Sequence, residues 1–124
     1  MKYKLTDIAF LLIARFDTVE RLENALLVSE YLVSNYDTNI YFWDVASHKS
    51  DIFPRLMPKG IKYLYKEDYD PILHRTRYIN DMVSFVSEKY VAVWDVDIII
   101  PVNQVLETMD FLRKGADFAY PYDK

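Results

Sequence analysis

The feature that most constrains the fold is an alternation of short apolar runs with segments of helical periodicity. The apolar runs are predicted strands, at residues 8–14, 40–45, 61–65, 90–95 and 117–120. Runs of this length that stay apolar throughout are typical of strands buried on both faces of a sheet. Because helical segments separate them, the pattern predicts an α/β fold with three layers, α/β/α. The sheet should be mostly parallel and joined by right-handed crossovers.

The helical segments have recognisable boundaries. The helix expected at residues 18–34 begins at the polar pair Asp17–Thr18, a typical N-cap. Polar residues at 35–39 predict a turn, and residues 46–60 predict a connection with one short helix. Proline is tolerated in the first turn of a helix, so Pro71 and Pro101 are each expected to open one.

Apolar spacing then predicts which side of each later helix is buried. The helix opened by Pro71 should bury an apolar stripe of Ile72, Ile79, Val83 and Val86, with Phe85 beside it. The helix opened by Pro101 should bury Val105, Leu106, Met109 and Leu112 and stop at Gly115.

Composition excludes several classes of protein. The 124 residues suit a single domain spanning 1–124, and 52% apolar residues suffice for a core. A net charge of −4 gives no electrostatic reason to expect nucleic acid as a partner. The absence of cysteine excludes a disulfide framework and a thiolate metal site, and it suits a cytoplasmic protein.

Polar side chains follow three of the predicted strands. Arg15 and Asp17 come after the first strand, Asp44 closes the second, and Asp95 and Asp97 close the fourth. In parallel α/β sheets, ligands bind at the carboxyl ends of the strands. These five side chains are therefore the candidate site residues.

Asp95 and Asp97 stand within the most hydrophobic segment of the chain. Side chains two apart in a strand share a face, and two buried carboxylates need compensation. Residues 91–112 contain neither lysine nor arginine. This pattern predicts a Mg²⁺ or Mn²⁺ ion held by both carboxylates, since such ions share their shell with substrate phosphates. In the alternative, one aspartate caps a helix or turn and the other is solvated.

A basic cluster precedes the fourth strand. Arg75 and Thr76 lie where the preceding helix begins, and the free N–H groups of a helix N-terminus favour anions. The alternative is a solvated basic face in which Arg77 pairs with Asp81.

Three stretches resemble GT-A fold nucleotide-sugar glycosyltransferases. Residues 15–24, RFDTVERLEN, look like the stretch after the first strand of bacterial capsule and chondroitin-polymerase-like enzymes. Residues 73–80, LHRTRYIN, and residues 94–101, WDVDIIIP, are similar to segments of the β-1,4-galactosyltransferases. The resemblance covers most of residues 7–122. It departs from the families at Ala14, where proline is usual, and at His74, where asparagine is common.

The resemblance implies a Rossmann-like GT-A fold and a metal-dependent glycosyltransferase. Sugar would pass from a nucleotide-diphosphate donor, UDP-linked, to an acceptor hydroxyl in surface polysaccharide synthesis. The implied positions are Ala14, Arg15 and Asp17 near the nucleoside, Asp44 near the uracil, Arg75 near the nucleotide, and Asp95 and Asp97 at the metal and ribose-diphosphate. No residue is assigned as catalytic base. In these families the acceptor half lies downstream of the strand matching 117–120, so the chain resembles a truncated, donor-binding half with little turnover of its own.

Two other functions stay open. One is a non-catalytic nucleotide-binding or dimerisation module. The other, ranked last, is a metal-dependent phosphohydrolase, which should carry an acidic nucleophile where Arg15 stands. The expected partners are a nucleotide-sugar donor and a glycan acceptor, without nucleic acid. Peripheral association with a membrane and a homodimer are left open.

Overall fold

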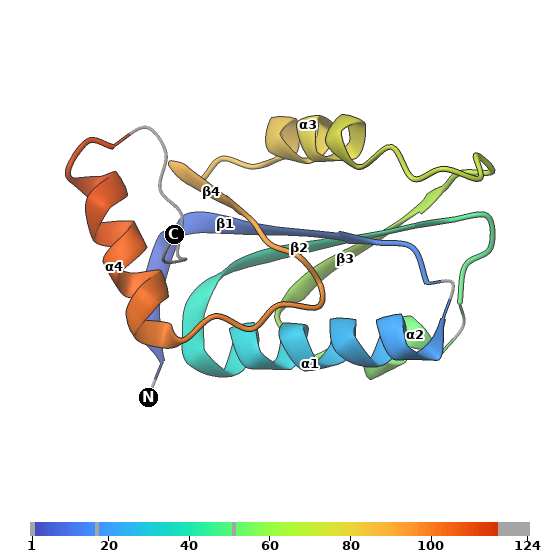
Figure 1. Cartoon of the computed structure of the whole chain (residues 1–124), viewed down its shortest axis with the longest axis horizontal. Helices are drawn as coiled ribbons and strands as arrows, with labels where there is room; N and C mark the ends of the chain where they lie inside the picture. Colours follow the sequence, from blue (N-terminus) through green and yellow to red (C-terminus); the bar gives the residue numbers. More distant parts are fainter. Residues whose placement is uncertain (1, 17, 51, 117–124) are drawn as a thin grey trace.

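Parallel strands form the centre of the computed structural model, which describes residues 2–16, 18–50 and 52–116 (Figure 1). The strands are β1 (Tyr3–Ala14), β2 (Tyr36–Ala46), β3 (Ile61–Glu67) and β4 (Tyr90–Val93). They form one sheet in the order β3-β2-β1-β4, and each neighbouring pair is parallel. The predicted α/β fold with a parallel sheet is confirmed at this level, and it is compatible with a Rossmann-like fold. The strand predicted at 117–120 lies outside the described residues.

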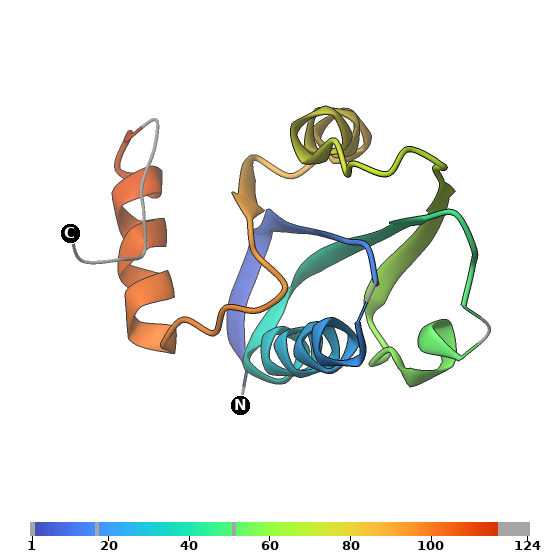
Figure 2. The ribbon, with the colours of Figure 1, turned by 45° about the vertical axis from the view of Figure 1, so that its right-hand side comes forward.

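Helices cover both faces of the sheet. They are α1 (Val19–Asn35), α2 (Phe53–Leu56), α3 (Arg75–Phe85) and α4 (Val102–Arg113). Figure 2 shows α1 and α2 on one face, α3 on the opposite face, and α4 to one side, near β1. Among the described residues, no helix combines the length and the apolar character needed to cross a bilayer.

The α1 helix begins as the sequence predicts. The Thr18 side chain accepts a hydrogen bond from the Arg21 backbone N–H at 3.1 Å, which makes Thr18 the N-cap. Glu20 lies in the first turn, where the helix dipole favours an acid. The face turned to the sheet buries Ala25, Val28, Ser29 and Leu32.

The turn predicted at residues 35–39 is wrong. The α1 helix ends at Asn35, and β2 begins at the next residue, Tyr36. Tyr36 is buried and stacks on Phe10 of β1, with ring centroids 5.9 Å apart. Burial of this large ring outweighs the turn preference of its polar neighbours.

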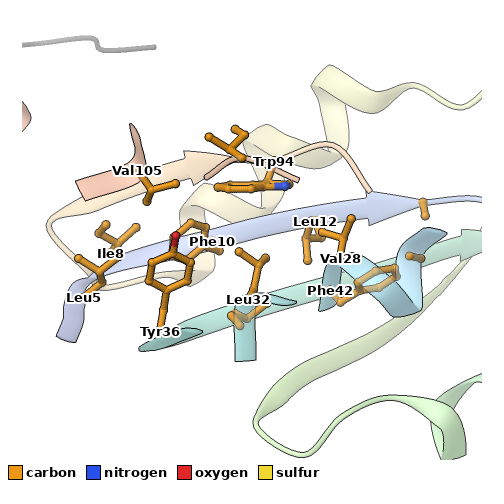
Figure 3. Packing of buried hydrophobic residues seen from close by; sticks show 14 of the residues in the cluster. Leu5, Ile8, Phe10, Leu12, Val28, Leu32, Tyr36, Phe42, Trp94 and Val105 are labelled. Carbon is orange, nitrogen blue, oxygen red and sulfur yellow. The ribbon is translucent and has the colours of Figure 1, made fainter. Parts of the chain in front are cut away.

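The larger core cluster lies between the sheet and α1. It includes Leu5, Ile8, Phe10 and Leu12 of β1, Val28 and Leu32 of α1, Tyr36 and Phe42 of β2, and Trp94 and Val105. Figure 3 shows these side chains together, with Trp94 and Val105 contributed by the chain after β4. Ile8 to Ala14 are all buried, as expected of a central strand. The cluster also takes in Met109, so α4 buries the side that the sequence predicts.

The smaller core cluster lies under α3. Its buried members are Ala9, Leu11, Ile13, Trp43, Val45 and Met82. The helix begins at Arg75, so the prediction that Pro71 opens it is wrong. Ile72 and Val83 of the predicted stripe are 67% and 44% exposed.

Two aspartates explain the late start of α3. The Asp68 carboxylate accepts the Asp70 backbone N–H at 2.8 Å, and the Asp70 carboxylate accepts the Ile72 N–H at 3.0 Å. These side chains offer the backbone an alternative to helical bonding. The segment therefore forms turns until residue 74.

Candidate functional site

The carboxyl edge of the sheet contains a switch point. From β1 the chain moves outward through β2 and β3, and then returns to place β4 on the other side of β1. Parallel α/β sheets bind ligands at such a point, because the connections leave the adjacent strand ends in opposite directions. The candidate residues at this edge are best taken strand by strand.

Arg75 and Asp95 meet at the β4 end of this edge. Arg75 is the first residue of α3, and its Nη2 donates to Asp95 Oδ1 at 2.6 Å. The two side chains are 43% and 49% exposed, so the pair is open to solvent. A cation, a carboxylate and a helix N-terminus therefore share one accessible place.

The strand argument for Asp95 and Asp97 does not hold. β4 ends at Val93, and the Ile98 N–H donates to the Asp95 carbonyl at 3.4 Å, which places both aspartates in a turn. Asp95 obtains its cation from Arg75, twenty residues earlier in the chain. Asp97 is exposed, and it has no hydrogen bond or ion pair with another described residue.

Whether these residues fit a divalent cation depends on which other ligands would complete the coordination shell of the ion. Within residues 2–16, 18–50 and 52–116, no group of three or more His, Asp or Glu side chains could hold a metal. Magnesium sites often use only one or two carboxylates, with substrate phosphates and waters supplying the remaining oxygens. Asp97, with Asp95 two residues before it, fits that type of site and not an all-protein cage.

Asp44 lies buried near the carboxyl end of β2. It is 2% exposed, and its Oδ2 accepts the Tyr63 hydroxyl at 2.6 Å. Its Oδ1 is buried without a hydrogen-bond partner among the described residues. Burial raises the pKa of the Asp44 carboxyl above its ordinary value, while the Tyr63 hydrogen bond acts in the opposite direction. An acceptor atom at this edge is thus left unused.

An aromatic cluster lies on the same side of the sheet as the Tyr63 ring. Phe53 packs against Phe16 and Tyr63, with centroids 4.3 and 5.7 Å apart, and Phe42 stacks with Tyr63 at 6.3 Å. Sequence reasoning assigned none of these rings to the site. The signal that could have found Tyr63 is strand register, because Phe42 of β2 pairs with Tyr63 of β3.

Arg15 is engaged by the protein. Its Nε donates to the Val45 carbonyl at 3.0 Å and its Nη1 to the Asp70 carbonyl at 2.5 Å. Its Nη2 lies 3.9 Å from Asp68 Oδ2. The Asp68 carboxylate also accepts the Tyr78 hydroxyl at 2.5 Å. The sequence did not indicate that Asp68 or Tyr78 belongs to this network.

The remaining candidates have simpler placements. Ala14 is buried at the end of β1, opposite Asp44 in the sheet register. Thr76 is exposed in the first turn of α3. Arg77 makes no ion pair with Asp81 in the described part of the chain, so that alternative is not seen. Asp17 lies outside the described residues.

Comparison with known proteins does not assign the chain to a family. No family model matches the chain, and a search of curated proteins finds no significant match. The functional argument therefore depends on the geometry of the carboxyl edge.

Proposed function

We propose that this chain binds a nucleotide-diphosphate sugar at the carboxyl edge of its sheet. It would form the donor-binding part of a GT-A-type glycosyltransferase, with a UDP-linked donor and a role in surface polysaccharide synthesis. The observation that carries the proposal is the contact of Arg75, at the start of α3, with Asp95, directly after β4. A cation at a helix N-terminus suits a diphosphate, and the switch point is where such a ligand is expected.

Asp44, near the carboxyl end of β2, is an argument for a nucleobase as part of the ligand. An ionised carboxylate accepts hydrogen bonds only, and Tyr63 already occupies Oδ2. The Oδ1 atom is buried without a hydrogen-bond partner among the described residues, and an N–H donor such as the imide of uracil would satisfy it after displacing the side chains that cover it. The rings of Phe16 and Phe53 provide a nearby aromatic environment. These features favour a UDP donor over a free sugar phosphate.

Arg75 would act on the leaving group. In the transfer, the bond between the sugar C1 and the diphosphate oxygen breaks, and a bond from C1 to the acceptor oxygen forms. The acceptor hydroxyl loses its proton, and UDP leaves with the bonding electron pair. Arg75 places a fixed positive charge where this negative charge develops. Asp97, with Asp95 assisting, would hold Mn²⁺ or Mg²⁺, and that ion would supply further neutralisation of the charge on the leaving group.

Isothermal titration with UDP tests the proposal. We expect binding in Mn²⁺, much weaker binding in EDTA, and loss of the metal-dependent part in Asp97→Asn. Asp110→Asn is the matched control, because Asp110 is an exposed carboxylate on α4. Equal heats in Mn²⁺ and EDTA would refute the metal contribution. Absence of binding in both would refute nucleotide binding itself.

A further inference from the structure

The guanidinium of Arg15 joins three segments of the chain. It extends from the end of β1, donates to the Val45 carbonyl in β2, and donates to the Asp70 carbonyl in the segment between β3 and α3. The side chain is only 17% exposed. Two of its nitrogens, Nε and Nη1, donate to the protein, and Nη2 is buried without a hydrogen-bond partner among the described residues, so a ligand at the carboxyl edge has little access to this cation.

Two routes of contact lead from Arg15 to the start of α3. In the first, Arg15 approaches Asp68, whose carboxylate accepts the Tyr78 hydroxyl from the first turns of α3. In the second, Arg15 holds the Asp70 carbonyl, and the Asp70 carboxylate lies 2.8 Å from His74 Nε2. The first route ends at Tyr78, three residues after Arg75, and the second at His74, directly before it, so the two routes hold the chain on either side of the residue that contacts Asp95.

We propose that Arg15 is a positioning residue, which ties the segment 68–74 to the sheet and so sets the place of Arg75. Its effect on ligand binding rests on the proposed function, whereas the tie itself does not. Arginine suits this task because its planar fork can donate to two carbonyls in different directions while approaching a carboxylate. Lysine keeps the charge but lacks the fork. This role differs from the direct contact with the nucleoside that the sequence resemblance implies.

Hydrogen exchange tests the tie without any ligand. In Arg15→Lys, amides of residues 68–80 should exchange at least about fivefold faster than in the native chain, since local opening becomes easier. Tyr78→Phe, which removes one route and leaves Arg15 intact, should accelerate the same segment by a smaller factor. Arg113→Lys is the matched control, because the Arg113 guanidinium likewise joins distant segments, by donating to the Asp7 carboxylate, but at a different place. Unchanged exchange at 68–80 in Arg15→Lys would overturn the proposal.

A double-mutant cycle tests the link to Arg75. UDP affinity is measured for the native chain, Arg15→Lys, Arg75→Gln and the double variant. If Arg15 acts through Arg75, Arg15→Lys should weaken binding about three- to tenfold in the native background and less than about twofold when Arg75 is absent. Arg15→Gln should resemble Arg15→Lys, because both lose the fork.

The alternative predicts a different pattern. If Arg15 contacts the nucleotide directly, the two losses should add, and Arg15→Lys should bind better than Arg15→Gln because its charge remains. That result would overturn the positioning role. If the native chain does not bind UDP, the proposed function fails. Hydrogen exchange alone then tests whether Arg15 holds the segment 68–74 against the sheet. Circular dichroism of each variant confirms that the comparison concerns folded protein.

Discussion

The Tyr63 hydroxyl donates to the carboxylate of Asp44 across 2.6 Å, and this bond joins neighbouring strands at the carboxyl edge. Asp44 is almost fully buried, so its charge has little water to stabilise it. The bond to Tyr63 is therefore central to the energetics of the edge.

Tyr63→Phe should destabilise the protein by about 1.5–3 kcal/mol near neutral pH, because a buried carboxylate loses its donor. The pKa of Asp44 is already raised by burial, so the folded state holds the proton more tightly than the unfolded chain. Stability should accordingly fall as pH rises from the ordinary value of 3.8 through the raised pKa, and level off above it. In Tyr63→Phe the pKa of Asp44 should rise further, so this fall should be larger and extend to higher pH. Urea unfolding at acid and neutral pH measures both effects, and an equal loss at both would contradict the assignment to ionised Asp44.

Asp95→Asn should raise the affinity for UDP in EDTA. Removing the carboxylate releases Arg75 for the phosphates, and a solvent-exposed ion pair of this kind corresponds to about a two- to fivefold change. In Mn²⁺ the same variant should not show this gain. Isothermal titration measures both values, with Arg75→Gln as the control that should weaken binding in each condition. A loss of affinity in EDTA would mean that Asp95 does not compete for Arg75.

Arg113→Gln should return the pKa of Asp7 toward its ordinary value. The hydrogen bonds from Arg113 Nε and Nη2, at 3.0 and 2.8 Å, lower the pKa of this carboxyl in the native chain. The stabilisation is present above the ordinary value of 3.8 and is lost as pH falls through the lowered pKa. Titration of the Asp7 carboxyl by NMR measures the change. An unaltered midpoint would show that the pair does not persist in solution.

Thr18→Ala should lower stability by about 1 kcal/mol, because the Arg21 backbone N–H loses its capping acceptor. Thr18→Ser is the control, since serine caps equally well. Chemical denaturation of the two variants provides the comparison. Equal stability of the two variants would show that the Thr18 side chain does not stabilise the start of α1.

Local patterns predicted the elements that local forces determine. The apolar run of β1, the N-cap at Thr18 and the buried side of α4 with its stop at Gly115 all agree with the structure. Gly115 adopts a φ of 110°, and its N–H donates to the Leu112 carbonyl, as a helix-terminating glycine does.

Contacts between distant segments account for what the sequence did not predict. Burial of Tyr36 against Phe10 replaces a turn by a strand, and side chains of Asp68 and Asp70 delay α3. At the site, the partner of Asp95 comes from another element, and that of Asp44 from a neighbouring strand. Periodicity along the chain does not predict the register between strands, and it does not predict which helix end lies close to which strand end.

The shared boundary of α1 and β2 also limits how this chain could vary in length. No loop separates Asn35 from Tyr36, so an added amino acid that the irregular register between Lys4 and Ala9 did not absorb would shift β2 by one position along β1. Successive side chains of a strand alternate between faces, so Trp43 and Asp44 would exchange sides. The buried acid would then face α3, and its unpartnered carboxylate oxygen would disappear from the edge where a donor is proposed to bind.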